Sequence, residues 1–121
     1  MIYKLDFYLP GLPPTTNGSH GHWRAAAAKR KEWRQASCFV ASGNRPPEPL
    51  RNAKLTLTRF SSNRPDFDNL TISFKSVVDG LKDAKVIHDD KDSVIIERVY
   101  QWEKAPPKKG KIRIQVEDKA A

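Results

Sequence analysis

The chain has 121 residues, which is enough for one domain with one core and too few for two ordinary domains. Its 22 lysines and arginines against 14 acidic residues give a formal net charge of +8. No eighteen apolar residues occur together and no cationic segment precedes an apolar run, so we expect neither a transmembrane helix nor a signal peptide. The expected location is the cytoplasm, without membrane contact, and the single cysteine, Cys38, agrees with a reducing compartment.

The positive charge favours a polyanionic partner, because lysines and arginines that contact phosphates release condensed counterions. Nucleic acid is the leading candidate. A basic surface that only keeps the protein soluble is the alternative, and composition does not separate the two. Hydrophobic residues make up 38% of the chain, which supports a folded but lean core and favours a partner subunit.

The first half of the chain predicts two strands with a helix between them. Residues 2–9 are rich in aromatic and aliphatic side chains and predict a strand that stops at Pro10. A loop dense in proline and glycine follows. The alanine-rich run 23–42 predicts a helix that ends at Gly43. Residues 53–60 alternate in the manner of a half-buried strand.

The second half predicts a helix and two further strands. Apolar residues at helical spacing indicate an amphipathic helix over 69–81, with Asp68 as its N-cap. Residues 93–102 and 111–117 predict strands, and the proline- and lysine-rich turn between them predicts a hairpin. The expected order is β-α-β-α-β-β. We therefore expect an α+β fold, one mixed β-sheet with two main helices, in a single domain spanning residues 1–121.

The first acidic stretch is "RPDFDNL", residues 64–70. In an extended segment Asp66 and Asp68 project from one side while Phe67 points into the core. Two like charges that face each other favour a bound cation, and carboxylates with waters and phosphate oxygens are the ligands that Mg²⁺ takes. The alternative is that Asp68 only caps a helix and Asp66 is a turn residue.

The second acidic stretch is "VIHDDKDSV", residues 86–94, in the connection that returns from the predicted helix to the sheet. If it ends near the start of that helix, Asp89 or Asp90 completes a site of three carboxylates. Because the helix is about 18 Å long at 1.5 Å per residue, the two acidic groups can also lie at its opposite ends. The spacing matches neither an EF-hand nor a zinc site.

These motifs together resemble the RusA family of Holliday junction resolvases. The family pattern has an Asp-x-Asp-Asn-Leu stretch, a helix with a lysine and an Asp-x-Leu, and an Asp-Asp pair before a strand. Here these correspond to "RPDFDNL", "KSVVDGL" (residues 75–81) and "VIHDDKDSV", and "LPPTTN" (residues 12–17) resembles the family's N-terminal loop. The family lysine usually stands about four residues beyond the second aspartate, where this chain has Ile72. A three-residue insertion restores the match at Lys75.

The resemblance implies a Mg²⁺-dependent endodeoxyribonuclease of DNA recombination and repair, homodimeric and encoded by a bacterial host or prophage, that cuts a four-way junction. Asp66, Asp68 and Asp90 would hold Mg²⁺, with Mn²⁺ as the alternative, and Lys75 would complete the catalytic set by stabilising the phosphate. The residues expected to contact DNA are Asn17, Arg24, Lys29, Arg30, Arg64, Asn69 and Lys91.

Two other functions stay open. The first is a metal-dependent nuclease that prefers forks or flaps, which would use the same catalytic residues. The second is a basic module that binds DNA junctions without cutting them. The presence of Asp66, Asp68 and Asp90 favours an enzyme over such a module.

Overall fold

Four strands and three helices lie in residues 3–15 and 23–120, the parts of the chain that this computed structural model describes. They are β1 (Lys4–Pro10), α1 (Trp23–Ser42), β2 (Ala53–Ser61), α2 (Phe67–Ser73), α3 (Lys75–Asp83), β3 (Ile95–Lys104) and β4 (Lys111–Asp118). The strands form one sheet in the order β1-β4-β2-β3. β3 is parallel to β2, whereas β4 is antiparallel to both β1 and β2. The predicted α+β class with a single mixed sheet is confirmed.

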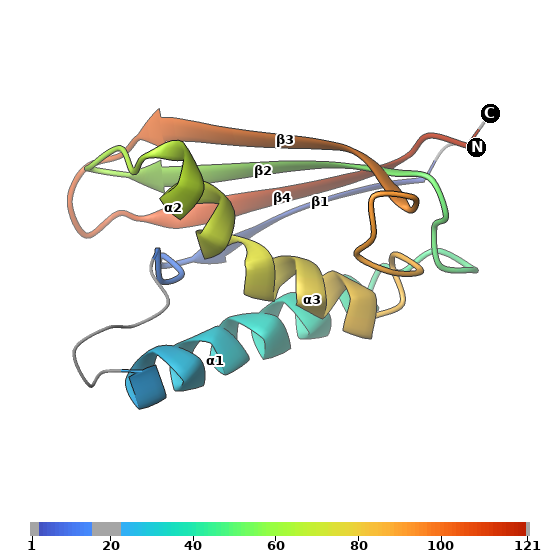
Figure 1. Cartoon of the computed structure of the whole chain (residues 1–121), viewed down its shortest axis with the longest axis horizontal. Helices are drawn as coiled ribbons and strands as arrows, with labels where there is room; N and C mark the ends of the chain where they lie inside the picture. The colour runs from blue at the N-terminus through green and yellow to red at the C-terminus, as the bar shows by residue number, and fades with distance from the viewer. Residues whose placement is uncertain (1–2, 16–22, 121) are drawn as a thin grey trace.

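The helices all lie on one face of the sheet and leave the other face uncovered (Figure 1). The alternation along β4 explains this layering, because Ile112, Ile114 and Val116 are buried while the residues between them are more exposed. The core that the sheet and helices share includes Leu55, Leu57, Phe74, Val77, Leu81, Ile112, Ile114 and Val116. No helix in the described part of the chain is long and apolar enough to cross a membrane.

Helices α1 and α3 approach each other closely at Gly80. A Cβ atom on this residue would lie 2.5 Å from the carbonyl oxygen of Arg34 and 2.7 Å from the Cβ of Ser37. At the same contact the Ser37 hydroxyl donates a buried hydrogen bond of 2.8 Å to the carbonyl oxygen of Val77. The contact fixes α3 on α1 and therefore fixes Lys75, the first residue of α3.

The predicted hairpin between the last two strands is wrong. β3 and β4 are not neighbours, because β2 lies between them and pairs with both. β4 has the buried alternation of a central strand and pairs along both edges, so it lies inside the sheet. The connection 105–110 contains two prolines and spans the width of β2, where a hairpin would have a tight turn.

The single helix predicted over 69–81 is two helices that meet at Phe74. This residue has φ −96° and ψ −3°, and its N–H bonds to the carbonyl oxygen of Thr71 at 3.1 Å, a shorter loop than an α-helical bond closes. Phe74 is fully buried and its ring packs on that of Tyr100, with 6.2 Å between the centroids. The order of elements therefore has one helix more than the sequence predicted.

Candidate functional site

Asp66 is the N-cap of α2, with an extended backbone of φ −68° and ψ 168°. Its Oδ1 accepts a hydrogen bond of 2.9 Å from the backbone N–H of Asn69. The prediction that Asp68 caps the helix is therefore wrong. Because the helix already begins at Phe67, directly after Pro65 and Asp66, it places Asp68 in its first turn.

Phe67 does not point into the core, as the sequence predicted. Its side chain is 65% exposed, and its ring packs edge to face on Tyr100 with 6.1 Å between the centroids. The prediction assumed an extended segment in which side chains alternate, and a helix that begins at this residue removes the alternation. Strand alternation therefore does not place Asp66 and Asp68 on the same side.

Lys75 and Asp90 come together at the start of α3. The ammonium nitrogen of Lys75 lies 3.7 Å from Oδ2 of Asp90 and 3.7 Å from Oδ1 of Asp79. Lys75 is exposed, whereas Asp79 and Asp90 are partly buried. The connection after α3 therefore returns to the N-terminal end of that helix, and it brings the second acidic stretch to the predicted lysine.

The connection is fixed here by several polar contacts. Asp89 accepts a hydrogen bond of 2.8 Å from the backbone N–H of Asp90 and forms ion pairs with Lys82 at 3.1 Å and Lys91 at 3.7 Å. The backbone N–H of Asp90, followed by the Lys82 ammonium, lowers the pKa of Asp89 to about 2. Arg98 donates a hydrogen bond of 2.5 Å to the carbonyl oxygen of Asp90 from strand β3.

A cavity of about 270 Å³ lies beside the Lys75–Asp90 pair, between the helices and β3. It is lined by Thr71, Ile72, Lys75, Val78, Asp90, Arg98 and Tyr100. Thr71 and Ile72 follow Asp68 by three and four residues, a spacing that places side chains on the same face of a helix. Asp68 therefore belongs to the side of α2 on which this cavity lies.

The three predicted metal ligands are not gathered around one point. Carboxylates suit Mg²⁺ as donors. However, in residues 3–15 and 23–120 no three His, Cys, Asp or Glu side chains form a group that could hold a metal ion. Asp66 binds a backbone N–H, and Asp90 faces the ammonium of Lys75. The carboxylates as described do not fit a ready three-ligand site, and a shared ion stays a prediction.

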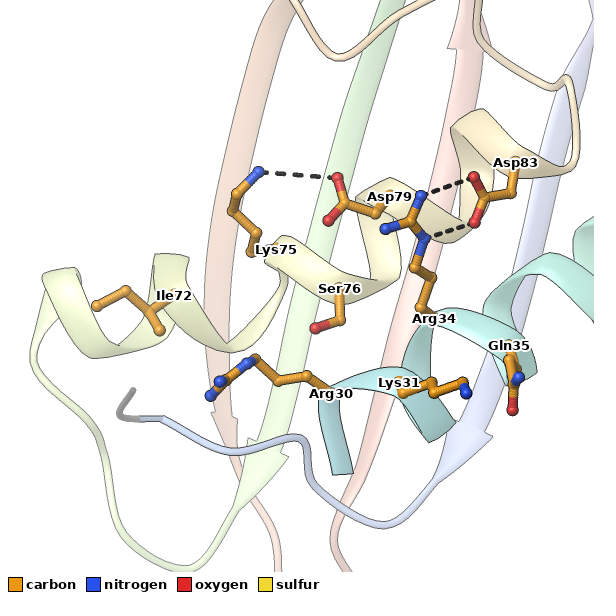
Figure 2. A pocket seen from close by; sticks show the side chains of 9 residues that line it. All are labelled: Arg30, Lys31, Arg34, Gln35, Ile72, Lys75, Ser76, Asp79 and Asp83. Atoms are coloured by element: carbon orange, nitrogen blue, oxygen red, sulfur yellow. Dashed lines mark hydrogen bonds and ion pairs between the residues drawn. The ribbon is translucent and has the colours of Figure 1, made fainter. Parts of the chain in front are cut away.

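A groove of about 1020 Å³ runs between α1 and α3. Its lining includes four basic and two acidic side chains: Arg30, Lys31, Arg34, Lys75, Asp79 and Asp83. Figure 2 shows Arg34 reaching from α1 to Asp83 on α3, with bonds of 2.6 and 2.9 Å that make this pair bidentate. Arg30 points instead toward the side of the groove where Ile72 lies.

Arg30 carries an unused donor in this groove. Its Nη1 atom is buried and has no hydrogen-bond partner among the described residues. A buried donor without a partner loses its hydration and gains nothing in return, so it favours a ligand that brings an acceptor. The groove therefore combines a net positive charge with a guanidinium whose buried nitrogen has no partner among the described residues.

The other residues predicted to contact DNA are spread over the molecule. Arg64 lies over the ring of Trp102, 5.7 Å from its centroid, and Lys91 pairs with Asp89. Lys29 forms an ion pair of 3.6 Å with Glu32, and Arg24 is exposed on the first turn of the same helix. Asn69 is partly buried in α2. Asn17 lies outside the described residues.

Sequence reasoning gave no role to Arg59, which anchors the loop that resembles the family's N-terminal loop. Arg59 is buried, and its Nη1 donates a hydrogen bond of 2.9 Å to the carbonyl oxygen of Pro13. Burial lowers the pKa of its guanidinium. Arg98 and Tyr100, which line the cavity, were also not singled out. Their two-residue spacing in a predicted strand was the available signal that they share a face.

The comparisons with known proteins add no name to this site. Neither a scan against protein-family models nor a search of curated proteins returns a match for this chain.

Proposed function

We propose that the chain is a Mg²⁺-dependent endodeoxyribonuclease similar to the RusA family, which resolves four-way DNA junctions in recombination and repair. The observation that carries this proposal is the 3.7 Å contact between the ammonium of Lys75 and the carboxylate of Asp90. The family resemblance assigns both residues to catalysis, and they come from separate stretches of the sequence. Their contact supports the residue match, including the lysine that stands three positions later than usual.

Lys75 would act on the phosphate through its charge. Its ammonium is exposed at the edge of the cavity and lies 3.7 Å from each of two carboxylates, so it is oriented without being enclosed. Exposed ion pairs of this kind are weak, and a phosphate oxygen can replace one carboxylate as the lysine's partner. In that position the ammonium would stabilise the negative charge that develops on the phosphate during cleavage.

The groove between α1 and α3 supports DNA as the substrate. It opens beside Lys75, and within it Asp83 balances the charge of Arg34. Arg30 and Lys31 have no acidic partner among the described residues, so the groove keeps their positive charge. Phosphates of one junction arm would bind in this groove, and the sugar–phosphate backbone of that arm would continue to Lys75. Such contacts fix position and carry little sequence information.

The requirement for Mg²⁺, or for Mn²⁺ in its place, enters the proposal from the resemblance. The described carboxylates are not gathered around one point, so no catalytic step is assigned to the ion. A homodimer enters from the symmetry of the substrate, because an isologous pair of subunits would place one site on each of two opposed strands. A cytoplasmic location in a bacterial host, or in a cell that carries a prophage, belongs to the same proposal.

The test is a cleavage assay with end-labelled four-way junctions, forks, flaps and plain duplexes, each incubated with Mg²⁺, Mn²⁺ or EDTA. We expect paired cuts in the junction with either metal, weaker cutting of forks and flaps, and none in EDTA. Preferential cutting of forks or flaps would move the assignment to that class of nuclease. Binding of the junction without any cutting would favour a non-catalytic module.

A further inference from the structure

The uncovered face of the sheet carries two aromatic rings and two cations in one cluster. Tyr8 of β1 and Phe60 of β2 have ring centroids 6.2 Å apart. The ammonium of Lys111 lies 4.9 Å from the centroid of Tyr8 and 5.1 Å from that of Phe60, and the guanidinium of Arg113 lies 5.4 Å from that of Tyr8. We call these four residues the aromatic platform.

Strand register places all four side chains on the same face. Tyr8 pairs with Arg113, and Phe60 pairs with Lys111. Ile112, which lies between the two basic residues, is fully buried on the helix side. Side chains alternate along a strand, so Lys111 and Arg113 must lie on the open side. The platform is therefore separate from the core and from the cavity beside Lys75.

Tyr8 and Lys111 of the platform are exposed, and Phe60 and Arg113 are partly exposed. Tyr8 is 48% exposed on the open face, whereas Leu5 and Leu9 on the opposite face of β1 are buried. Rings and cations side by side on an open sheet face are the combination that binds single-stranded nucleic acid, because bases stack on the rings and phosphates meet the cations.

We propose that the aromatic platform binds unpaired bases of single-stranded DNA. A base would stack on Tyr8 and Phe60 in the place that the Lys111 ammonium now occupies. The flexible lysine would then turn to the adjoining phosphate. Arg113 contributes less charge, because Asp6 binds it through bonds of 2.6 and 2.9 Å, and this pair holds the guanidinium over Tyr8.

The aromatic platform lies where a DNA strand that leaves the candidate site could reach it. Phe60 lies near the end of β2, and the chain continues from there through Arg64 to Asp66 at the start of α2. Figure 1 shows the end of β2 beside α2, at the end of the sheet where β4 begins. The choice of DNA over other polyanions rests on the proposed function, whereas the stacking site rests on the geometry of the four residues.

The test is equilibrium binding of a fluorescent oligothymidylate of twelve nucleotides, measured by fluorescence anisotropy. The buffer contains EDTA, because binding is measured without cleavage. Tyr8→Ala should weaken binding by about 5- to 150-fold, the range for the loss of one stacked base, while Tyr8→Phe should bind within about twofold of the native chain. Lys111→Gln should weaken binding and make it less sensitive to salt. Affinity for a blunt duplex should be unchanged by Tyr8→Ala.

Three results would overturn the proposal. The first is unchanged binding of the oligonucleotide by a folded Tyr8→Ala chain, and if that variant does not fold, unchanged binding by Lys111→Gln decides in the same way. The second is an equal loss of duplex binding. The third is a change in oligomeric state on sedimentation without a change in binding, which would make the platform a contact between copies of the chain. The binding assay needs no cutting. Its result therefore stays valid even if the chain proves not to be a nuclease.

Discussion

The ammonium nitrogen of Lys75 lies 3.7 Å from Oδ2 of Asp90, and the connection after α3 returns along the helix to make this contact. The same nitrogen lies 3.7 Å from Oδ1 of Asp79, one helical turn further along α3. Two carboxylates therefore orient one exposed lysine at the edge of the cavity. This relationship connects the second acidic stretch of the sequence with helix α3.

Replacing Lys75 by methionine tests its role in cutting. We expect Lys75→Met to reduce junction cleavage by about 100-fold, as the loss of one charge-stabilising donor does in other enzymes, with junction affinity changed only a few-fold. Lys82→Met is the matched control, because Lys82 also lies on α3 and pairs with an aspartate of the same connection, Asp89. Single-turnover cleavage rates measure both. Equal rates for the two variants would remove Lys75 from the catalytic set.

Two substitutions at Asp66 separate its role as a helix cap from a role in catalysis. Asparagine caps helices as well as aspartate does. The free energy of unfolding of Asp66→Asn should therefore lie within a few tenths of a kcal/mol of the native value, whereas that of Asp66→Ala should be lower by about 1 kcal/mol. Both variants should fail to cut a junction if the negative charge is needed. Urea unfolding and the cleavage assay give the two readings. If Asp66→Asn cuts the junction at the native rate, Asp66 serves only as the helix cap and has no role in catalysis.

Gly80 is expected to tolerate no side chain. Alanine would place its Cβ 2.5 Å from the carbonyl oxygen of Arg34 and 2.7 Å from the Cβ of Ser37, so α1 and α3 must move apart. We expect Gly80→Ala to lower the free energy of unfolding by about 2 kcal/mol, even though alanine favours helices.

Gly43→Ala is the control for Gly80→Ala, since the nearest atom to its added Cβ is the carbonyl oxygen of Val40 at 3.6 Å, an ordinary contact. It should change the stability by less than about 0.5 kcal/mol. Urea unfolding compares the two variants. Equal stability of both would mean that the helices are not packed as closely as described.

The Arg34–Asp83 pair should make stability depend on pH. The hydrogen bonds from Arg34 hold the pKa of Asp83 below its ordinary value, so the folded chain binds fewer protons here than the unfolded chain. The stabilisation is therefore complete above the ordinary pKa of aspartate and is lost as the pH falls through the lowered one. Because both side chains are well exposed, it amounts to at most about 1 kcal/mol.

Asp83→Asn should accordingly be less stable than the native chain at pH 7, and the difference should shrink below about pH 4. Thermal unfolding at a series of pH values measures it. Glu48→Gln, at an exposed carboxylate in the connection before β2, should show no such trend. A constant difference across the series would mean that the Arg34–Asp83 contact does not form in solution.

Most helices and strands were predictable from the sequence, because hydrophobic periodicity, prolines and glycines are signals that act within a short stretch of chain. The alanine-rich segment is helix α1 with the expected ends, and the alternation of β2 put Arg59 on the same side as Leu55 and Leu57, where it is buried. The helix break at Phe74 was not visible, since apolar spacing continues through it. The strand order was also missed, because pairing across the sheet depends on tertiary packing and not on sequence proximity.

The candidate site was predictable to a similar extent. The resemblance assigned Lys75 and Asp90 to one site, and these two residues are in contact. Motif spacing alone allowed the second acidic stretch to lie at either end of the helix. The local roles of Asp66, Phe67 and Asp68 did not, because they depend on whether the helix begins at residue 67 or 69, and turn residues allow either. Asp79, the second partner of Lys75, carried an available signal in its i, i+4 spacing from the lysine.

The measurement that tests the central claim most directly is cleavage of a labelled four-way junction by the native chain and by Asp68→Asn, each with Mg²⁺ and with EDTA. The account predicts metal-dependent cutting by the native chain and none by Asp68→Asn, which should bind the junction as tightly or more tightly because a negative charge near the phosphate is gone. Undiminished cutting by Asp68→Asn, or equal cutting in EDTA, would contradict it.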